Sequence, residues 1–132
     1  MIYLIGIPGL IPFYLCFYNI DLIFLDFDKD MFVYYSAVIM SFLGAVYWGV
    51  YLQSKNNIAI LFSVCPAVYA FLVLAFDLKF DETIGFFIIG YFIILCFDFF
   101  FYFKDKIIQT DYFILRLMLT AGIAPAHILY II

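Results

Sequence analysis

The sequence predicts an all-α membrane protein, with about five transmembrane helices packed as an antiparallel bundle. Of the 132 residues, 70% are hydrophobic and only 12% are charged, whereas soluble domains are about 45–50% apolar and about 25% charged. Polar residues divide the chain into five apolar blocks, and four of these are 19 to 22 residues long. Such blocks can span a hydrocarbon core about 30 Å thick. The composition excludes a soluble enzyme, a disordered tail and a disulfide scaffold.

The first predicted helix covers about residues 8–27. Its beginning carries Pro8, Gly9 and Pro12. Proline inside a helix removes a hydrogen bond and bends the chain, so we expect this helix to start or bend near Pro8. No lysine or arginine precedes the apolar run, unlike in a secretory signal or a transit peptide. We therefore expect the N-terminal segment to be retained as the first membrane segment.

Four further helices are predicted over about residues 31–52, 58–76, 84–103 and 112–132. Each of these blocks lacks the strict alternation of apolar and polar residues that a membrane β-barrel needs. The polar loops between blocks are about four to eight residues long, so consecutive helices should be antiparallel neighbours. We expect one transmembrane domain over residues 1–132.

Basic residues predict how the chain is oriented. Five helices would place the two termini on opposite sides of the membrane, and short loops on the inner side are richer in lysine and arginine. The N-terminal side carries Lys55, Lys104, Lys106 and the entry point of Arg116, and the opposite side carries Lys29 and Lys79. We expect the N-terminus in the cytoplasm, or in the matrix of a mitochondrion. An aromatic belt is expected at Tyr47, Trp48 and Tyr51.

Small residues line one face of the helix predicted over 31–52. They lie four residues apart, which places them along one helical face, and they are Ala37, Ser41, Ala45 and Gly49. Gly44 enlarges this small surface but sits beside the stripe. Small faces let membrane helices approach closely. We interpret the stripe as a helix–helix packing face, with a substrate path as the alternative.

Asp98 and Arg116 are the most informative polar residues. Both lie inside apolar blocks, about nine residues before and nine after the centre of the loop between the last two helices. In an antiparallel hairpin they should reach a similar depth. A lone charge in the membrane is costly, and an arginine–carboxylate pair offsets that cost. We expect an intramembrane ion pair that clamps the two helices, or a site for protons, an anion or a quinone head group.

Other chemistry is weakly represented. His127 is the only histidine, so bis-histidine haem ligation is excluded; we expect it at the interface, bonded to a carbonyl or water. The three cysteines, Cys16, Cys65 and Cys96, fall in different apolar blocks and are expected as small core residues. A net charge of −4 excludes nucleic acid as a partner. We find no catalytic motif, no metal-ligand spacing and no cofactor fingerprint.

Four stretches occur in one order and suggest a family: GLIPF at Gly9–Phe13, YSAVIMSFLGAVYWG at Tyr35–Gly49, CPA at Cys65–Ala67 and LRLMLT at Leu115–Thr120. The chain resembles the transmembrane protein 69 family, or domain of unknown function 3429, over nearly its whole length. The resemblance implies a small multi-pass inner-membrane protein of a proteobacterium or a mitochondrion. The family pattern carries over to Ser41, Phe42, Leu43, Gly44, Trp48, Gly49, Asp98, Arg116 and Thr120. Tyr47 stands where many relatives have histidine or arginine.

Two function classes follow. The first is a non-catalytic accessory subunit or assembly partner of a larger membrane complex of the respiratory type, because the chain has no soluble domain and few internal polar groups. Its partners would be the lipid bilayer and other transmembrane subunits. The second is a small oligomeric transporter or channel that uses Asp98 and Arg116. Transporters usually show paired broken helices in two repeated halves, and this chain shows one such break.

Overall fold

The computed structural model describes residues 4, 6–18, 28–76, 78–105 and 108–132. Within these residues the regular structure is helical throughout, so the predicted fold class is confirmed. Four helices are long and apolar enough to cross a membrane. They are α3 (Lys29–Ser54), α4 (Asn57–Ala75), α5 (Phe80–Phe100) and α6 (Thr110–Ile131).

The N-terminal segment forms a shorter element. A 3-10 helix, η1 (Ile7–Leu10), continues into α2 (Ile11–Phe17). Pro8 and Pro12 sit in the first turns of these two helices, where proline costs no helical hydrogen bond. The eleven residues Ile7–Phe17 are apolar but too few to cross a hydrocarbon core about 30 Å thick. Residues 19–27 of the predicted first helix lie outside the described residues.

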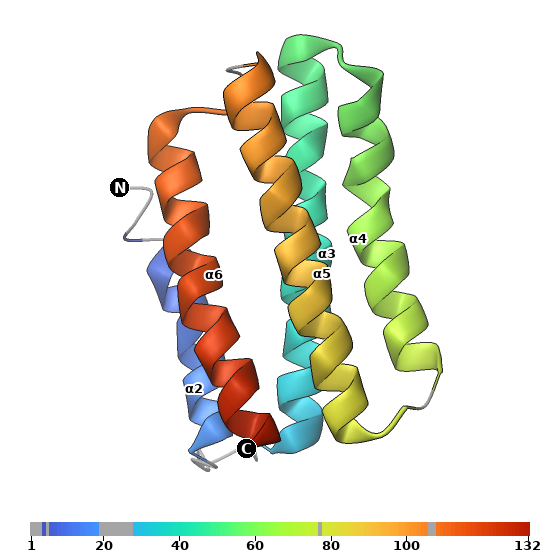
Figure 1. The fold of residues 1–132 in the computed structure, drawn as a ribbon, viewed down its shortest axis with the longest axis vertical. Helices are drawn as coiled ribbons and strands as arrows, with labels where there is room; N and C mark the ends of the chain where they lie inside the picture. Colours follow the sequence, from blue (N-terminus) through green and yellow to red (C-terminus); the bar gives the residue numbers. More distant parts are fainter. Residues whose placement is uncertain (1–3, 5, 19–27, 77, 106–107) are drawn as a thin grey trace.

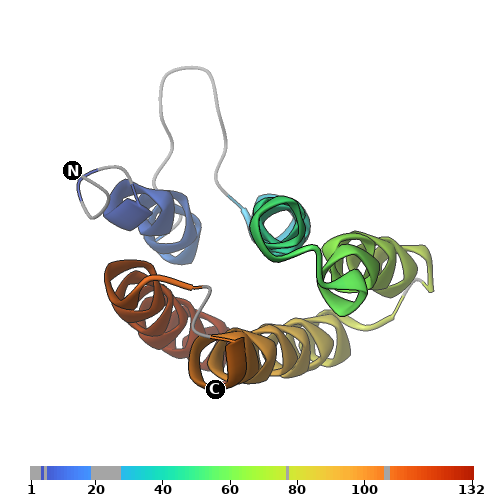
Figure 2. The same cartoon turned by 90° about the horizontal axis from the view of Figure 1, so that it is seen from above.

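The helices run antiparallel to their neighbours along the chain (Figure 1). Viewed along the helices, α2 lies beside α6, α6 beside α5, and α3 beside α4 (Figure 2). α3 also packs against α5 and α2, so it holds the central position in the bundle. This arrangement places the end of α3, the end of α5 and the beginning of α6 at the same end of the molecule (Figure 1).

Polar residues set the helix boundaries. The Asp28 side chain accepts from the Met31 amide at 2.9 Å and caps α3, and Asn56 caps α4 in the same way through the Ile58 amide. Lys55, between α3 and α4, has a left-handed backbone with φ 56°. α5 passes into one π-helical turn, η2 (Phe101–Asp105). The polar clusters between the apolar blocks therefore terminate the helices as the sequence predicts.

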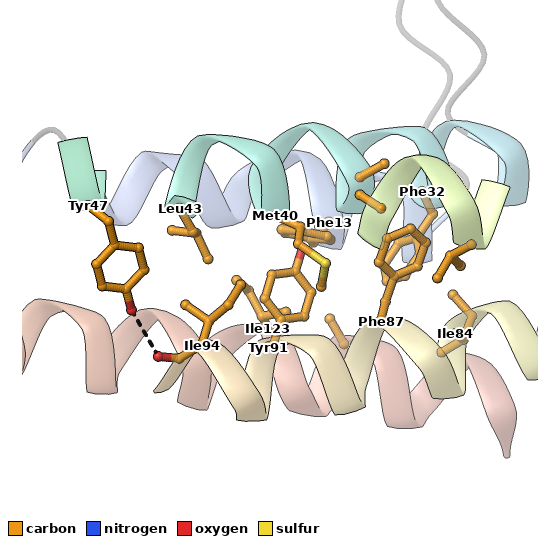
Figure 3. Packing of buried hydrophobic residues seen from close by; sticks show 14 of the residues in the cluster. Phe13, Phe32, Met40, Leu43, Tyr47, Ile84, Phe87, Tyr91, Ile94 and Ile123 are labelled. Atoms are coloured by element: carbon orange, nitrogen blue, oxygen red, sulfur yellow. Dashed lines mark hydrogen bonds between the residues drawn. The ribbon is translucent and has the colours of Figure 1, made fainter. Parts of the chain in front are cut away.

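The core is formed by large apolar side chains that meet between α3 and α5 (Figure 3). Met40, Phe32 and Phe87 are fully buried. Phe13 of α2 joins them, and its ring meets the Phe32 ring edge-on at 5.3 Å between centroids. α2 thus contributes to the core although it is short.

Tyrosine hydroxyls join the helices through backbone carbonyls. Tyr14 of α2 donates to Gly122 O of α6 at 3.0 Å, and Tyr130 of α6 donates in return to Cys16 O of α2. A helical carbonyl oxygen has a second lone pair, so it accepts these bonds without losing its own helical bond. Three further bonds of this kind run from Tyr35 to Gly9 O, from Tyr69 to Phe86 O and from Tyr91 to Ser36 O, each at 2.8 Å.

Glycine permits the close contact between α3 and α4. A Cβ atom added to Gly44 would lie 2.9 Å from both Pro66 Cγ and Ser63 O. The predicted packing face differs from this contact. Ala37 is buried and Ser41 is half-buried, but Ala45 and Gly49 are exposed. Within the described residues, α3 and α4 therefore approach each other closely at Gly44. Gly44 lies beside the stripe of small residues, because the side of α3 that faces α4 is shifted by one residue from that stripe.

The two glycines of α3 provide a matched test of this contact. Gly44→Ala should be less stable than Gly49→Ala by about 1–3 kcal/mol, the usual cost of overpacking. Gly49 is the control because its added Cβ meets nothing within 4 Å. Unfolding in mixed micelles, followed by circular dichroism, measures the difference. Equal stabilities of the two variants would show that α3 and α4 do not approach at Gly44.

Candidate functional site

Asp98 of α5 and Arg116 of α6 lie together in the interior. Arg116 Nε is 2.8 Å from Asp98 Oδ2, and both side chains are almost completely buried. The Nε–H group has no aligned hydrogen-bond acceptor, so charge attraction rather than an N–H···O bond dominates this contact. The pair is electrically neutral as a unit. This removes most of the cost of placing either charge at membrane depth.

Tyr47 of α3 completes the polar cluster. Its hydroxyl lies 2.8 Å from Asp98 Oδ1 and 3.2 Å from the Ile94 carbonyl oxygen, and the second contact is drawn in Figure 3. The sequence places Tyr47 in an aromatic belt, and that interpretation is wrong because Tyr47 is 1% exposed. The available signal was depth: Tyr47 precedes Ser54, the end of α3, by as many residues as Asp98 precedes Asp105, the end of the η2 turn that continues α5.

The SFLG segment of α3 lies against this cluster. The Leu43 carbonyl accepts from Arg116 Nη2 at 3.4 Å, and Gly44 admits α4 on the other side of the helix. Ser41 bonds back to the Ala37 carbonyl at 2.9 Å. Phe42 and Trp48 are exposed. The segment therefore joins the ion pair to the α3–α4 contact.

A cavity of about 370 Å³ adjoins Arg116. It lies between η1, α3 and α6, and its walls are mainly apolar. Tyr112 and Thr120 of α6 also line it. The Tyr112 hydroxyl is buried and has no hydrogen-bond partner among the described residues, while its ring lies 5.5 Å from the Arg116 guanidinium carbon. No sequence pattern singles out Tyr112, because tyrosine is common throughout this chain.

A second polar cluster surrounds His127. Its Nδ1 is 3.0 Å from the Ile123 carbonyl, and its Nε2 is 3.0 Å from Ser36 Oγ. A carbonyl only accepts, so Nδ1 carries a proton. The single proton of the Ser36 hydroxyl is shared between Nε2 of His127 and the Phe32 carbonyl, which lies 2.8 Å from Ser36 Oγ. The predicted carbonyl partner is present. His127 is fully buried inside the bundle, among the rings of Phe13, Phe32 and Tyr91.

The cysteine prediction holds for one residue of three. Cys16 is buried, whereas Cys65 and Cys96 are exposed on the outside of the bundle. Hydrophobicity cannot separate the two positions in this chain, since the lipid-facing surface is as apolar as the core. In the part of the chain that the structure describes, no group of three or more histidine, cysteine or acidic side chains is placed to hold a metal ion.

Comparison with known proteins gives one match. The model of the family described as "Protein of unknown function (DUF3429)" matches residues 1–132. The chain belongs to this family. No curated protein and no solved structure gives a significant match. The DUF3429 match covers all the residues described above, including the ion pair and the cavity.

The chemistry open to this DUF3429 protein follows from the two clusters. Asp98 accepts from Tyr47 and pairs with Arg116, so both of its oxygen atoms are engaged. Arg116 lines the cavity, whereas the hydroxyl of Tyr112 is buried away from it. None of these groups forms the nucleophile–base pair that covalent catalysis requires. The site is suited to holding helices together.

Removing one charge tests whether Asp98 and Arg116 act as a clamp. Asp98→Asn should destabilise the fold by about 3–5 kcal/mol, because it leaves the buried Arg116 charge uncompensated. The double variant Asp98→Arg with Arg116→Asp should recover part of that loss. Unfolding in mixed micelles measures all three proteins.

The control is Asp81→Asn, an exposed position in the first turn of α5, which should change stability by less than about 0.5 kcal/mol. Single and double variants that keep wild-type stability would contradict the clamp and favour a purely functional site.

Proposed function

We propose that this protein is a non-catalytic integral subunit, or an assembly partner, of a larger membrane complex of the respiratory type. The observation that carries the proposal is that both members of the Asp98–Arg116 ion pair have their partners inside the bundle. Inside the bundle, Asp98 accepts from Tyr47 and pairs with Arg116. Arg116 in turn donates to the Leu43 carbonyl. A charge pair bonded in this way stabilises the position of helices and offers no free acid or base for catalysis.

The outer surface supports the same proposal. At most 39% of the residues in the apolar window of each long helix are buried within the chain, so the greater part faces lipid or other proteins. α3 exposes Phe42, Ala45 and Gly49, and Gly49 leaves open space beside it. Small exposed residues allow a helix of another subunit to approach closely. A partner subunit that packs against this face of α3 would contribute a transmembrane helix.

The alternative, a small oligomeric transporter or channel, has less support. Its path would have to connect the ion pair with the polar cluster at His127. Met40, Leu43 and Ile94 are buried. They lie between Tyr47, which belongs to the ion-pair cluster, and Phe32, whose ring contacts His127 (Figure 3). An apolar layer of this kind opposes the passage of ions. In an oligomer the path could instead run between copies, so oligomeric state separates the two proposals.

We propose a location from the distribution of basic residues and from the resemblance to transmembrane protein 69. The protein would lie in an inner membrane, either the cytoplasmic membrane of a bacterium or the mitochondrial inner membrane, with its N-terminus on the cytoplasmic or matrix side. The resemblance agrees with either membrane. Lys55, at the end of α3, lies at the opposite end of the bundle from Lys29 and Lys79, as this orientation requires.

A blue-native gel tests the subunit proposal. The tagged protein, extracted from its own membrane in mild detergent, should migrate with a complex much larger than 15.5 kDa, and mass spectrometry should identify transmembrane subunits in the same band. Gly49→Leu should release it, because the added side chain projects into open space on the exposed face of α3.

Gly85→Leu is the matched control, since a Cβ at Gly85 also meets nothing within 4 Å. Migration of the wild-type protein as a monomer would contradict the proposal. Migration as a small homo-oligomer would contradict it too and would favour the transporter.

A further inference from the structure

A pocket of about 210 Å³ lies at the end of the bundle where α3 and α5 begin and α4 ends (Figure 1). Asp30, Val33 and Tyr34 line it from α3, because residues three and four apart share one helical face. Phe80 and Thr83 line it from α5. Helices long enough to span the hydrocarbon core end near its polar boundary, so this pocket lies at the level of the lipid head groups.

The pocket offers acceptors for a positively charged group. Asp30 is exposed, lines the pocket and makes no ion pair among the described residues. The Thr83 hydroxyl donates to the Lys79 carbonyl at 3.1 Å, so its oxygen remains an acceptor. A carboxylate that accepts from an ammonium forms a charge-assisted hydrogen bond, which is stronger than a bond between neutral groups.

A cation lies beside the same pocket. Lys29 Nζ is 5.1 Å from the centroid of the Phe80 ring, and Phe80 is one of the lining residues. Among the described residues Lys29 makes no ion pair, so its ammonium is open to a phosphate, which lysine binds as a point charge. Two consecutive residues of α3 therefore present a cation and an anion to one occupant.

This charge pattern is complementary to a zwitterionic head group. An anionic head group would meet the carboxylate of Asp30 without an ammonium to satisfy it, and like charges placed together are unfavourable. A quaternary ammonium has no N–H to donate and binds best over an aromatic face, but Lys29 already lies over the Phe80 ring. A primary ammonium has three N–H donors, which suit the acceptors at Asp30 and Thr83.

The surface next to the pocket suits acyl chains. Leu74 of α4 lines the pocket and is exposed. One helical turn further into the membrane, Val38 of α3 follows Tyr34 on the same face and Phe71 of α4 precedes Leu74. Both are exposed, Val38 by 61% and Phe71 by 68%. The polar pocket is thus continuous with an apolar, lipid-facing surface.

We propose that this pocket binds a phospholipid whose zwitterionic head group ends in a primary amine, as in phosphatidylethanolamine. The ammonium donates to Asp30 and Thr83, and the phosphate pairs with Lys29. The site involves no covalent or redox step. The proposal stands independently of the subunit role, because one chain forms the pocket.

The test is native mass spectrometry of the full chain in detergent micelles. The delipidated protein is titrated separately with phosphatidylethanolamine, phosphatidylcholine and phosphatidylglycerol that carry the same acyl chains. Phosphatidylethanolamine should bind about fivefold more tightly than either of the others, the upper range for an exposed charge pair. Phosphatidylcholine lacks the N–H donors, and phosphatidylglycerol lacks the ammonium.

Two variants separate the two ends of the head group. Asp30→Ala should abolish the preference for phosphatidylethanolamine, and Asp81→Ala should keep it. Asp81 is the matched control because it holds the same place in the first turn of α5 as Asp30 holds in α3, but does not line the pocket. Lys29→Gln should weaken all three lipids about fivefold, because each contains the phosphate. Lys55→Gln should change none, since Lys55 also lies over a ring, that of Tyr51 at 5.6 Å, but at the opposite end of α3.

The proposal is overturned if the three lipids bind the wild type equally, or if phosphatidylcholine or phosphatidylglycerol binds more tightly than phosphatidylethanolamine. It is also overturned if Asp30→Ala keeps the preference, or if Asp81→Ala loses it to the same extent. Circular dichroism checks the folding of each variant. Asp30→Asn, which keeps the shape of the side chain and removes its charge, is the second variant at this position and should show the same loss of preference over phosphatidylglycerol.

Discussion

Every polar group in the membrane-spanning part of this chain must find its partner inside the protein, and the structure depends on that constraint. An unsatisfied polar group in hydrocarbon costs several kcal/mol, and apolar contact alone does not drive helices together in lipid. Apart from the Tyr112 hydroxyl and the Nε–H of Arg116, the interior groups described above meet the constraint through tyrosine hydroxyls bonded to carbonyls of other helices, the Asp98–Arg116 pair and the Ser36–His127 pair. The same bonds that satisfy polar groups therefore fix which helices are neighbours.

The helical architecture could be predicted from the sequence because length and hydropathy are its physical causes. The four long helices begin and end within a few residues of the predicted blocks, since polar clusters such as the one at Asp28 cap them. The first helix was harder to predict. The start agrees with the expectation from Pro8, since η1 covers Ile7–Leu10. Hydropathy continues from residue 8 to residue 27, so it does not predict that α2 ends at Phe17.

The inside and the outside of the bundle could not be told apart from composition. In water, an apolar residue prefers the core, but in lipid both environments are apolar. Composition predicts Cys65 and Cys96 in the core, and they are exposed, while Tyr47 is expected at the interface and is buried. The positions of Asp98 and Arg116 are easier to predict, because a charged side chain at membrane depth is stable only inside the bundle, beside an opposite charge. The cavity beside Arg116 and the buried hydroxyl of Tyr112 could not be predicted from the sequence, because both depend on how the helices pack in three dimensions.

The most direct test of this account is a tyrosine-to-phenylalanine series, with stability measured by unfolding in mixed micelles. The bonded set comprises tyrosines that donate to a carbonyl of another helix: Tyr14, Tyr69, Tyr91 and Tyr130. The exposed set is Tyr18 and Tyr34. Each variant of the bonded set should lose about 0.6 kcal/mol, the average for hydrogen bonds between membrane helices, and each exposed variant should lose nothing. Equal losses in the two sets would contradict the account that tyrosine–carbonyl bonds hold the helices together.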